Sequence, residues 1–180
     1  MIREMGMRML IPEIHDIRDR DIQNFVRKAL NEIVDEKFFI IPASSTGKYH
    51  PTYSAGVGGL LRHTKAACYI GKALCEAEMI CQEDKDLIQA ALILHDINKP
   101  AKEHPYMVRE TLLPLKEEFP LTYEKVIELI ESHHGQWGEY PINTYQKRIV
   151  HLADYISSQK GLIFSYDQGT DYSDLLWEEK

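Results

Sequence analysis

The segment AALILHDINK, residues 90–99, places a histidine and an aspartate directly after five apolar residues. A short polar loop that carries Lys99 follows His95 and Asp96. Burying an unpaired carboxylate is costly, or it forces the group to take up a proton. A chain with this segment must therefore fold so that a compensating positive group reaches Asp96.

Apolar residues recur at helical spacing along most of the chain, and no convincing strand pattern is present. The clearest example is residues 19–36, which predict an amphipathic helix with one apolar face. That face comprises Ile22, Phe25, Val26, Ala29, Leu30, Ile33 and Val34. The sequence therefore predicts an all-α fold.

Further helices are expected over about 58–80, about 84–95, from Pro105 to Pro114, about 122–133 and about 143–158. Asp84, Thr122 and Asn143 are the expected N-caps, and Pro105 suits a first helical position. Residues 38–59 are rich in Pro, Ser, Gly and Tyr, which predicts a short extended piece followed by a long loop.

Length and charge narrow the class of protein. A chain of 180 residues predicts a single domain over 1–180: an N-terminal helix and loop over 1–54, a core over 55–160 and an acidic tail over 161–180. The net charge of −7 argues against a surface for long nucleic acids but allows a small anionic substrate. Neither a membrane-spanning run nor a signal-peptide centre is evident, so we expect a cytoplasmic protein without membrane contact.

Four helices each bring a histidine or an aspartate to their apolar face. His63, His95 and His133 follow apolar residues at helical spacing, and Asp154 does so inside IVHLADYIS. A single histidine of this kind is usually a core residue with a satisfied hydrogen bond. Several on converging helices, together with carboxylates, favour a transition-metal site, and a divalent cation would compensate Asp96 and Asp154.

The motifs GGLLRHT, LHDINK, ESHHG and HLADYIS resemble, in order and spacing, the HD-domain metal-dependent phosphohydrolases. The resemblance covers residues 55–160 and implies that His63, His95, Asp96 and Asp154 are metal ligands. It also implies that Lys99 faces the substrate phosphate. Asn98 stands where the family often has glycine, and the Gly-Tyr-Pro pattern of cyclic-dinucleotide phosphodiesterases is not reproduced.

In two-metal members of this superfamily, the aspartate of the His-Asp pair bridges the ions and extra histidines hold the second one. That resemblance would make Asp96 the bridge and would place His104 and one or both of His133 and His134 on a second ion. The expected cofactor is one or two divalent ions, with manganese, iron, cobalt, nickel or zinc suited to the donors and magnesium also compatible.

Several residues outside the motifs are candidates for binding substrate. Arg62 and Lys99 would add positive charge that binds the substrate phosphate. The alternative for Arg62 is an ordinary exposed arginine on a helix. Lys48 and His50 lie in the loop before His63, which is either a lid over the substrate or an ordinary surface loop.

The leading hypothesis is a phosphohydrolase in which Asp96 and Lys99 serve catalysis on a nucleotide, a cyclic nucleotide or a short oligonucleotide. One alternative is a di-iron HD-domain oxygenase, in which Lys99 would bind another polar group. A second alternative is a non-catalytic, ligand-binding regulatory HD domain. The retention of every signature residue counts against the regulatory domain.

Overall fold

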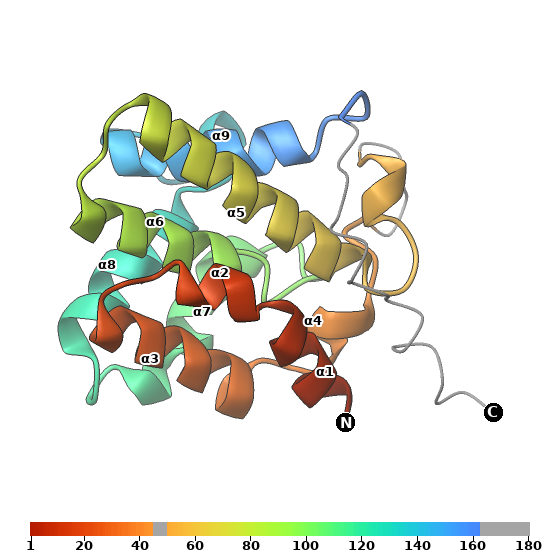
Figure 1. Cartoon of the computed structure of the whole chain (residues 1–180), viewed down its shortest axis with the longest axis horizontal. Helices are drawn as coiled ribbons and strands as arrows, with labels where there is room; N and C mark the ends of the chain where they lie inside the picture. Colours follow the sequence, from red (N-terminus) through yellow and green to blue (C-terminus); the bar gives the residue numbers. More distant parts are fainter. Residues whose placement is uncertain (45–49, 163–180) are drawn as a thin grey trace.

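The computed structural model describes residues 1–44 and 50–162, which form helices joined by turns and loops without a strand (Figure 1). The prediction of an all-α fold is confirmed. No helix of these residues is long and apolar enough to cross a bilayer. The α-helices are α1 (Ile2–Met9), α2 (Ile11–His15), α3 (Arg20–Lys28), α4 (Lys37–Ile40), α5 (Gly59–Ala77), α6 (Gln82–Leu94), α7 (His104–Thr111), α8 (Pro120–Glu131) and α9 (Tyr145–Ser157).

Helix α6 lies at the centre of the fold, in contact with α3, α5, α8 and α9. Every residue from Asp86 to Leu94 is buried, which explains why this segment is nearly continuous in apolar residues. Figure 1 shows α5 and α9 crossing above α6, with α2 and α3 in front of it. The His-Asp pair at the end of α6 is therefore carried into the interior.

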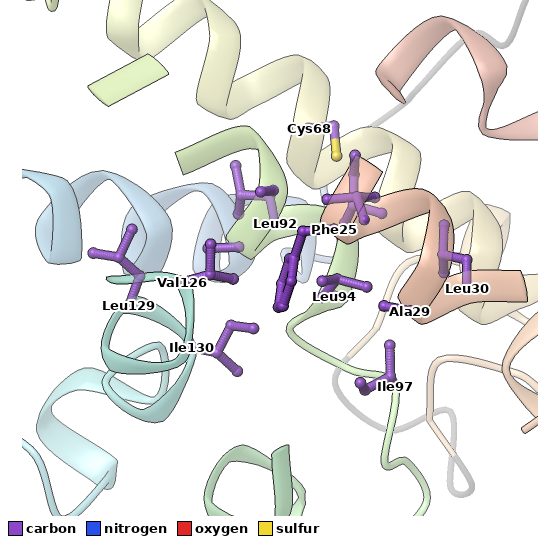
Figure 2. Packing of buried hydrophobic residues seen from close by; sticks show 14 of the residues in the cluster. Phe25, Ala29, Leu30, Cys68, Leu92, Leu94, Ile97, Val126, Leu129 and Ile130 are labelled. Carbon is purple, nitrogen blue, oxygen red and sulfur yellow. The ribbon is translucent and has the colours of Figure 1, made fainter. Parts of the chain in front are cut away.

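The hydrophobic core is continuous from the N-terminal helices to α8. The ring of Phe25 on α3 lies among side chains of α6 and α8, near Leu94 and Val126 (Figure 2). Phe25 also meets Phe119 edge to face, with the ring centroids 5.8 Å apart. The apolar face predicted over 19–36 is buried except for Ile33, which is partly buried. After Lys28 the helix continues as a π-helical turn from Ala29 to Ile33.

The N-terminal region holds more helix than the sequence predicted. Helices α1 and α2 were not foreseen, and α4 is a helical turn where a short extended piece was expected. Phe38 and Phe39 of α4 are both buried, so tertiary packing outweighs the strand preference of these aromatic residues. A Cβ atom at Gly6 would lie only 2.1 Å from the ring of Phe39, so α1 approaches α4 closely because residue 6 is glycine.

Four helices begin at residues other than those predicted. Helix α6 begins at Gln82, and the carboxylate of Asp84, instead of capping it, accepts hydrogen bonds from Tyr145 and Gln146 of α9. Helix α8 begins two residues before Thr122. The Thr122 hydroxyl instead donates to Asp21 at 2.7 Å and so ties α8 to α3. The side chains of Asp84 and Thr122, which were predicted as caps, therefore each join two helices.

The N-cap of α9 is Thr144, one residue after the predicted Asn143, and its hydroxyl oxygen accepts a backbone N–H of the first turn. Helix α7 begins at His104, which places Pro105 second rather than first. The predicted stop at Pro114 is close to the observed end of α7 at Thr111.

An arginine links α7 to the end of α8. Arg109 donates two hydrogen bonds to the carboxylate of Glu131, each 2.8 Å long, and a third at 3.0 Å to Glu124. The Glu131 side chain is only 7% exposed, whereas that of Glu124 is 48% exposed. The pair of Arg109 and the buried Glu131 joins the helix that begins with His104 to the helix that leads into His133.

Replacing Arg109 with methionine should lower the free energy of unfolding by roughly 1–3 kcal/mol, because Glu131 would remain buried without its charged partner. Urea unfolding monitored by circular dichroism measures the change. The control Glu124→Gln removes the exposed partner of the same arginine and should cost less than about 1 kcal/mol. Equal losses in both variants would show that the buried pair has no special importance.

Candidate metal centre

Asp96 lies in the turn after α6, and its side chain is 1% exposed. Its Oδ2 atom is 3.2 Å from His95 Nε2, 3.4 Å from His63 Nε2 and 2.7 Å from Lys99 Nζ. Its Oδ1 atom faces the other way, 3.0 Å from His104 Nε2 and 3.9 Å from His133 Nε2. The two oxygens of one carboxylate thus face two different sets of histidines.

The potential ligands form two compact groups among the described residues. One comprises His63, His95 and Asp96, and the ligand atoms of the group lie within 4.8 Å of one another. The other comprises His104, His133 and His134, with ligand atoms equally close together. The structure therefore brings together the residues that the sequence predicted for a first and a second ion.

Asp154 of α9 completes the first group. Its Oδ1 lies 3.0 Å from His63 Nε2 and 3.6 Å from His95 Nε2. The hydroxyl of Ser157, one turn later on α9, lies 3.3 Å from His63 Nδ1 and donates to the backbone carbonyl of Asp154. Helices α5, α6 and α9 are all needed to place these donors.

The other histidines are oriented by backbone carbonyls one turn earlier in the chain. Nδ1 of His95, His104 and His133 lies 2.7–2.9 Å from the carbonyl oxygens of Leu92, Ala101 and Ile130, respectively. An Nδ1–H that donates to a carbonyl leaves Nε2 with its lone pair, which is the form that binds a metal. All three Nε2 atoms lie within 4 Å of an oxygen of Asp96.

Several of these polar atoms are buried without a hydrogen bond. They are Nε2 of His104, Nε2 of His133 and both carboxylate oxygens of Asp96. Unsatisfied buried groups are costly, so each requires an explanation. Apart from the Lys99 ammonium, which lies 2.7 Å from Asp96 Oδ2, these buried imidazole nitrogens and carboxylate oxygens fit the donor set of divalent transition-metal ions.

The protonation of the cluster follows from its charges. Burial raises the pKa of Asp96 and Asp154, but the nearby histidines outweigh it and hold both pKa values well below the usual range. Burial lowers the pKa of His95, but the carboxylates outweigh it and raise that pKa to about 10. Without an ion, the proton on His95 therefore offsets the carboxylates, and a divalent cation would displace it.

His133 and His134 lie just past the last residue of α8, in a turn rather than on the helix end expected from the sequence. Burial holds the pKa of His133 well below its usual value, so its Nε2 lone pair is available. Gly135 follows with φ of +58°, and a Cβ there would lie 2.4 Å from the ring of His151. His151 Nδ1 is 2.8 Å from the His133 carbonyl oxygen, so it supports this turn.

The predicted substrate-binding residues make different contacts in the structure. Lys99 lies at the cluster, where its Nζ also donates to the carbonyl of Ala43 at 3.2 Å. The guanidinium of Arg62 donates to the carbonyls of Tyr53 and Ala55, and its expected role with substrate stays a prediction. Lys48 lies outside the described residues.

His50 lies at the first donor group, with its ring centroid 5.4 Å from that of His63. Burial, together with the nearby His63 and Lys99, lowers the pKa of His50 to about 4. Its Nε2 lies 3.4 Å from the Ser158 hydroxyl. His50 therefore belongs to the wall of the site, whereas the movement of a lid stays a prediction.

Sequence reasoning missed Ser157 altogether and left the role of His151 open. Ser157 stands one turn after Asp154, in HLADYIS, so its position next to the ligands was visible in the helical spacing. The role of His151 depends on the turn at Gly135, which no local spacing reveals.

Sequence comparison finds relatives of this chain among known proteins. The Methanocaldococcus jannaschii protein named dihydroneopterin 2',3'-cyclic phosphate phosphodiesterase is 28% identical over 179 residues, which cover 85% of this chain and 69% of that protein. Proteins named 3'-5' exoribonuclease YhaM from Geobacillus sp. and Oceanobacillus iheyensis are each 26% identical over 186 residues, or 91% of this chain. The chain spans about half the length of these exoribonucleases, 55% and 56%.

No solved structure matches the chain significantly. The family model described as HD domain matches residues 60–159, more than half of the chain, and this range contains His63, His95, Asp96 and Asp154. The chain belongs to the HD domain family.

Proposed function

We propose that this protein is a metal-dependent phosphohydrolase that cleaves a phosphate ester of a small nucleotide-like substrate. The observation that carries the proposal is the position of Asp96, whose two oxygens face two groups of histidines. The names of the relatives, a cyclic phosphate phosphodiesterase and exoribonucleases, both denote hydrolases of phosphate esters.

In this proposal His63, His95, Asp96 and Asp154 hold one divalent ion. His104, His133 and His134, together with Asp96, would hold a second ion. Bound ions of this kind lower the pKa of a coordinated water and polarise a phosphoryl oxygen, and a pair about 3.5–4 Å apart clamps the attacking and leaving oxygens. The nitrogen-rich donor set favours manganese, iron, cobalt, nickel or zinc over magnesium, which prefers oxygen.

Lys99 is the proposed partner of the substrate phosphate. Its ammonium group lies beside Asp96, and its side chain is 16% exposed, so it is close to the cluster and still reachable from solvent. Phosphoryl transfer depends mainly on positioning and on stabilising negative charge, which a fixed ammonium group provides. His50 forms the adjacent wall and would exclude water from that side.

The size of the substrate follows from charge as well as from the site. A net charge of −7 disfavours a surface that follows a long phosphate backbone. Because two of the relatives are named exoribonucleases, the proposal also includes a single-stranded end that enters the site. We therefore propose small nucleotides and short single-stranded oligonucleotides as the substrate class.

Hydrolysis of phosphate esters in nucleotides, 2',3'-cyclic nucleotides and short oligonucleotides should occur with manganese, iron, cobalt or nickel and should stop when a chelator is added. Chromatographic detection of products measures both mono- and diester cleavage. Oxygen consumption with iron and no phosphate-ester cleavage would instead favour the di-iron oxygenase. Binding of a nucleotide without turnover under any metal would favour a regulatory domain.

The metal content should change stepwise with the ligands removed. Elemental analysis of reconstituted protein should give two ions per chain. His133→Gln should give about one, because only the second group is damaged, whereas Asp96→Asn should lose most of both. The control His15→Gln changes an exposed histidine on α2 and should keep both ions. One ion in the unmodified protein and in His133→Gln alike would reduce the site to a single ion.

Lys99→Ala should lower kcat/KM by about 10²–10³-fold, the typical loss when one group that stabilises developing charge is removed. The metal content should be unchanged, because Lys99 is assigned to the substrate. Lys102→Ala, which removes an exposed lysine from the same loop, should retain full activity. Loss of metal in Lys99→Ala would assign Lys99 to the support of Asp96 instead.

A further inference from the structure

A cavity of about 630 Å³ opens directly beside the metal centre. His133, His134 and Asp154 line it on the side of the proposed ligands, and Trp137 and Tyr155 line it elsewhere. The proposed chemistry uses the histidines and the aspartate but gives no task to the two aromatic residues. Their continuity with the site suggests that they contact another part of the same substrate.

The aromatic residues of this cavity form a stack. The rings of Trp137 and Tyr155 have centroids 5.6 Å apart and planes 26° apart, and His151 lies on Tyr155 at 6.1 Å and 24°. Although it is part of this stack, the Trp137 residue is 64% exposed, and Tyr155 is 43% exposed. A large aromatic surface that remains open to water next to a reactive centre is typical of a binding site.

The stack is held in a fixed position relative to the histidines. Trp137 ends a short 3-10 turn, Gly135–Trp137, that directly follows His133 and His134. His151 contacts both the turn with the proposed ligands and the aromatic stack. Its Nδ1 lies 2.8 Å from the His133 carbonyl oxygen, and its ring centroid lies 6.0 Å from that of Trp137. The same turn therefore presents two proposed ligands and the aromatic surface.

The charge of the cavity selects the kind of group that it can hold. Among the described residues, no lysine or arginine lines it, and its one carboxylate, that of Asp154, is already assigned to a metal ion. Away from the proposed ligands the cavity therefore has no cationic side chain to bind a second phosphate, whereas a neutral planar ring needs none. Heteroaromatic rings stack on tryptophan and tyrosine through their flat faces, so the strength of stacking depends little on which base is present.

We infer that Trp137 and Tyr155 form a stacking surface for the planar heteroaromatic ring of the substrate, a purine or a similar bicyclic ring, while its phosphate lies at Asp96. This inference rests on the proposed function and extends it to the recognition of the substrate. The ring would be bound by its face, so the surface selects nucleotide-like esters over phosphate esters that lack a ring.

Kinetics with matched substrates test the inference. For adenosine 2',3'-cyclic phosphate, Trp137→Ala should raise KM about 10- to 100-fold, the effect expected for loss of one stacked base, with kcat changed little. Ribose 2',3'-cyclic phosphate, which has no base, should show the same KM with both proteins. Trp137→Phe should restore most of the affinity, and Tyr69→Leu, an exposed tyrosine of α5, should behave as the unmodified protein.

Fluorescence gives a second measurement that does not require turnover. The chain has two tryptophans, so in a Trp177→Phe protein the emission comes from Trp137 alone. Adenosine should quench this emission saturably in the metal-loaded protein, and ribose should not. Absence of quenching together with an unchanged KM in Trp137→Ala would overturn the inference. Saturable quenching without hydrolysis of any phosphate ester would instead support the stacking surface and refute the proposed function.

Discussion

The arrangement of the whole site depends on one buried carboxylate. Asp96 is held in the interior at the end of the central helix, and each of its oxygens must meet positive charge or a metal to remain ionised. Helices α5, α6, α7 and α9 and the turn after α8 each bring a group to this cluster. The fold can therefore be understood as the helical packing that places imidazole groups on both sides of one aspartate.

Much of this was predictable from the sequence because helical periodicity shows which residues share a face. His63, His95 and Asp154 each continue an apolar stripe, so the sequence placed all three in the interior, and the structure brings them within 4 Å of one another. The all-α class follows from the same periodicity. His104 had no such signal. It reaches Asp96 because the loop after α6 folds back, which is a tertiary event.

The remaining features depend on contacts between segments far apart in the chain. Asp84 and Thr122 have the local pattern of N-caps, yet both side chains join other helices, because a tertiary hydrogen bond competes equally well with a local one. The turn after α8 takes its shape from Gly135 against His151, 16 positions apart in the numbering. Sequence spacing therefore located three of the proposed ligands, His63, His95 and Asp154, but not the residues that orient the cluster.

The anchoring of three histidines on carbonyls three residues earlier has a consequence for ion exchange. The orientation of each ring is set within its own turn of backbone, so it does not depend on which ion is present. If the cluster holds metal ions as proposed, we expect little reorganisation on loading and exchange between ions of similar radius without repacking of the helices. The identity of the resident ion is then governed by availability and by the intrinsic affinity order of the divalent metals, so one polypeptide can show different reactivity in different ionic surroundings.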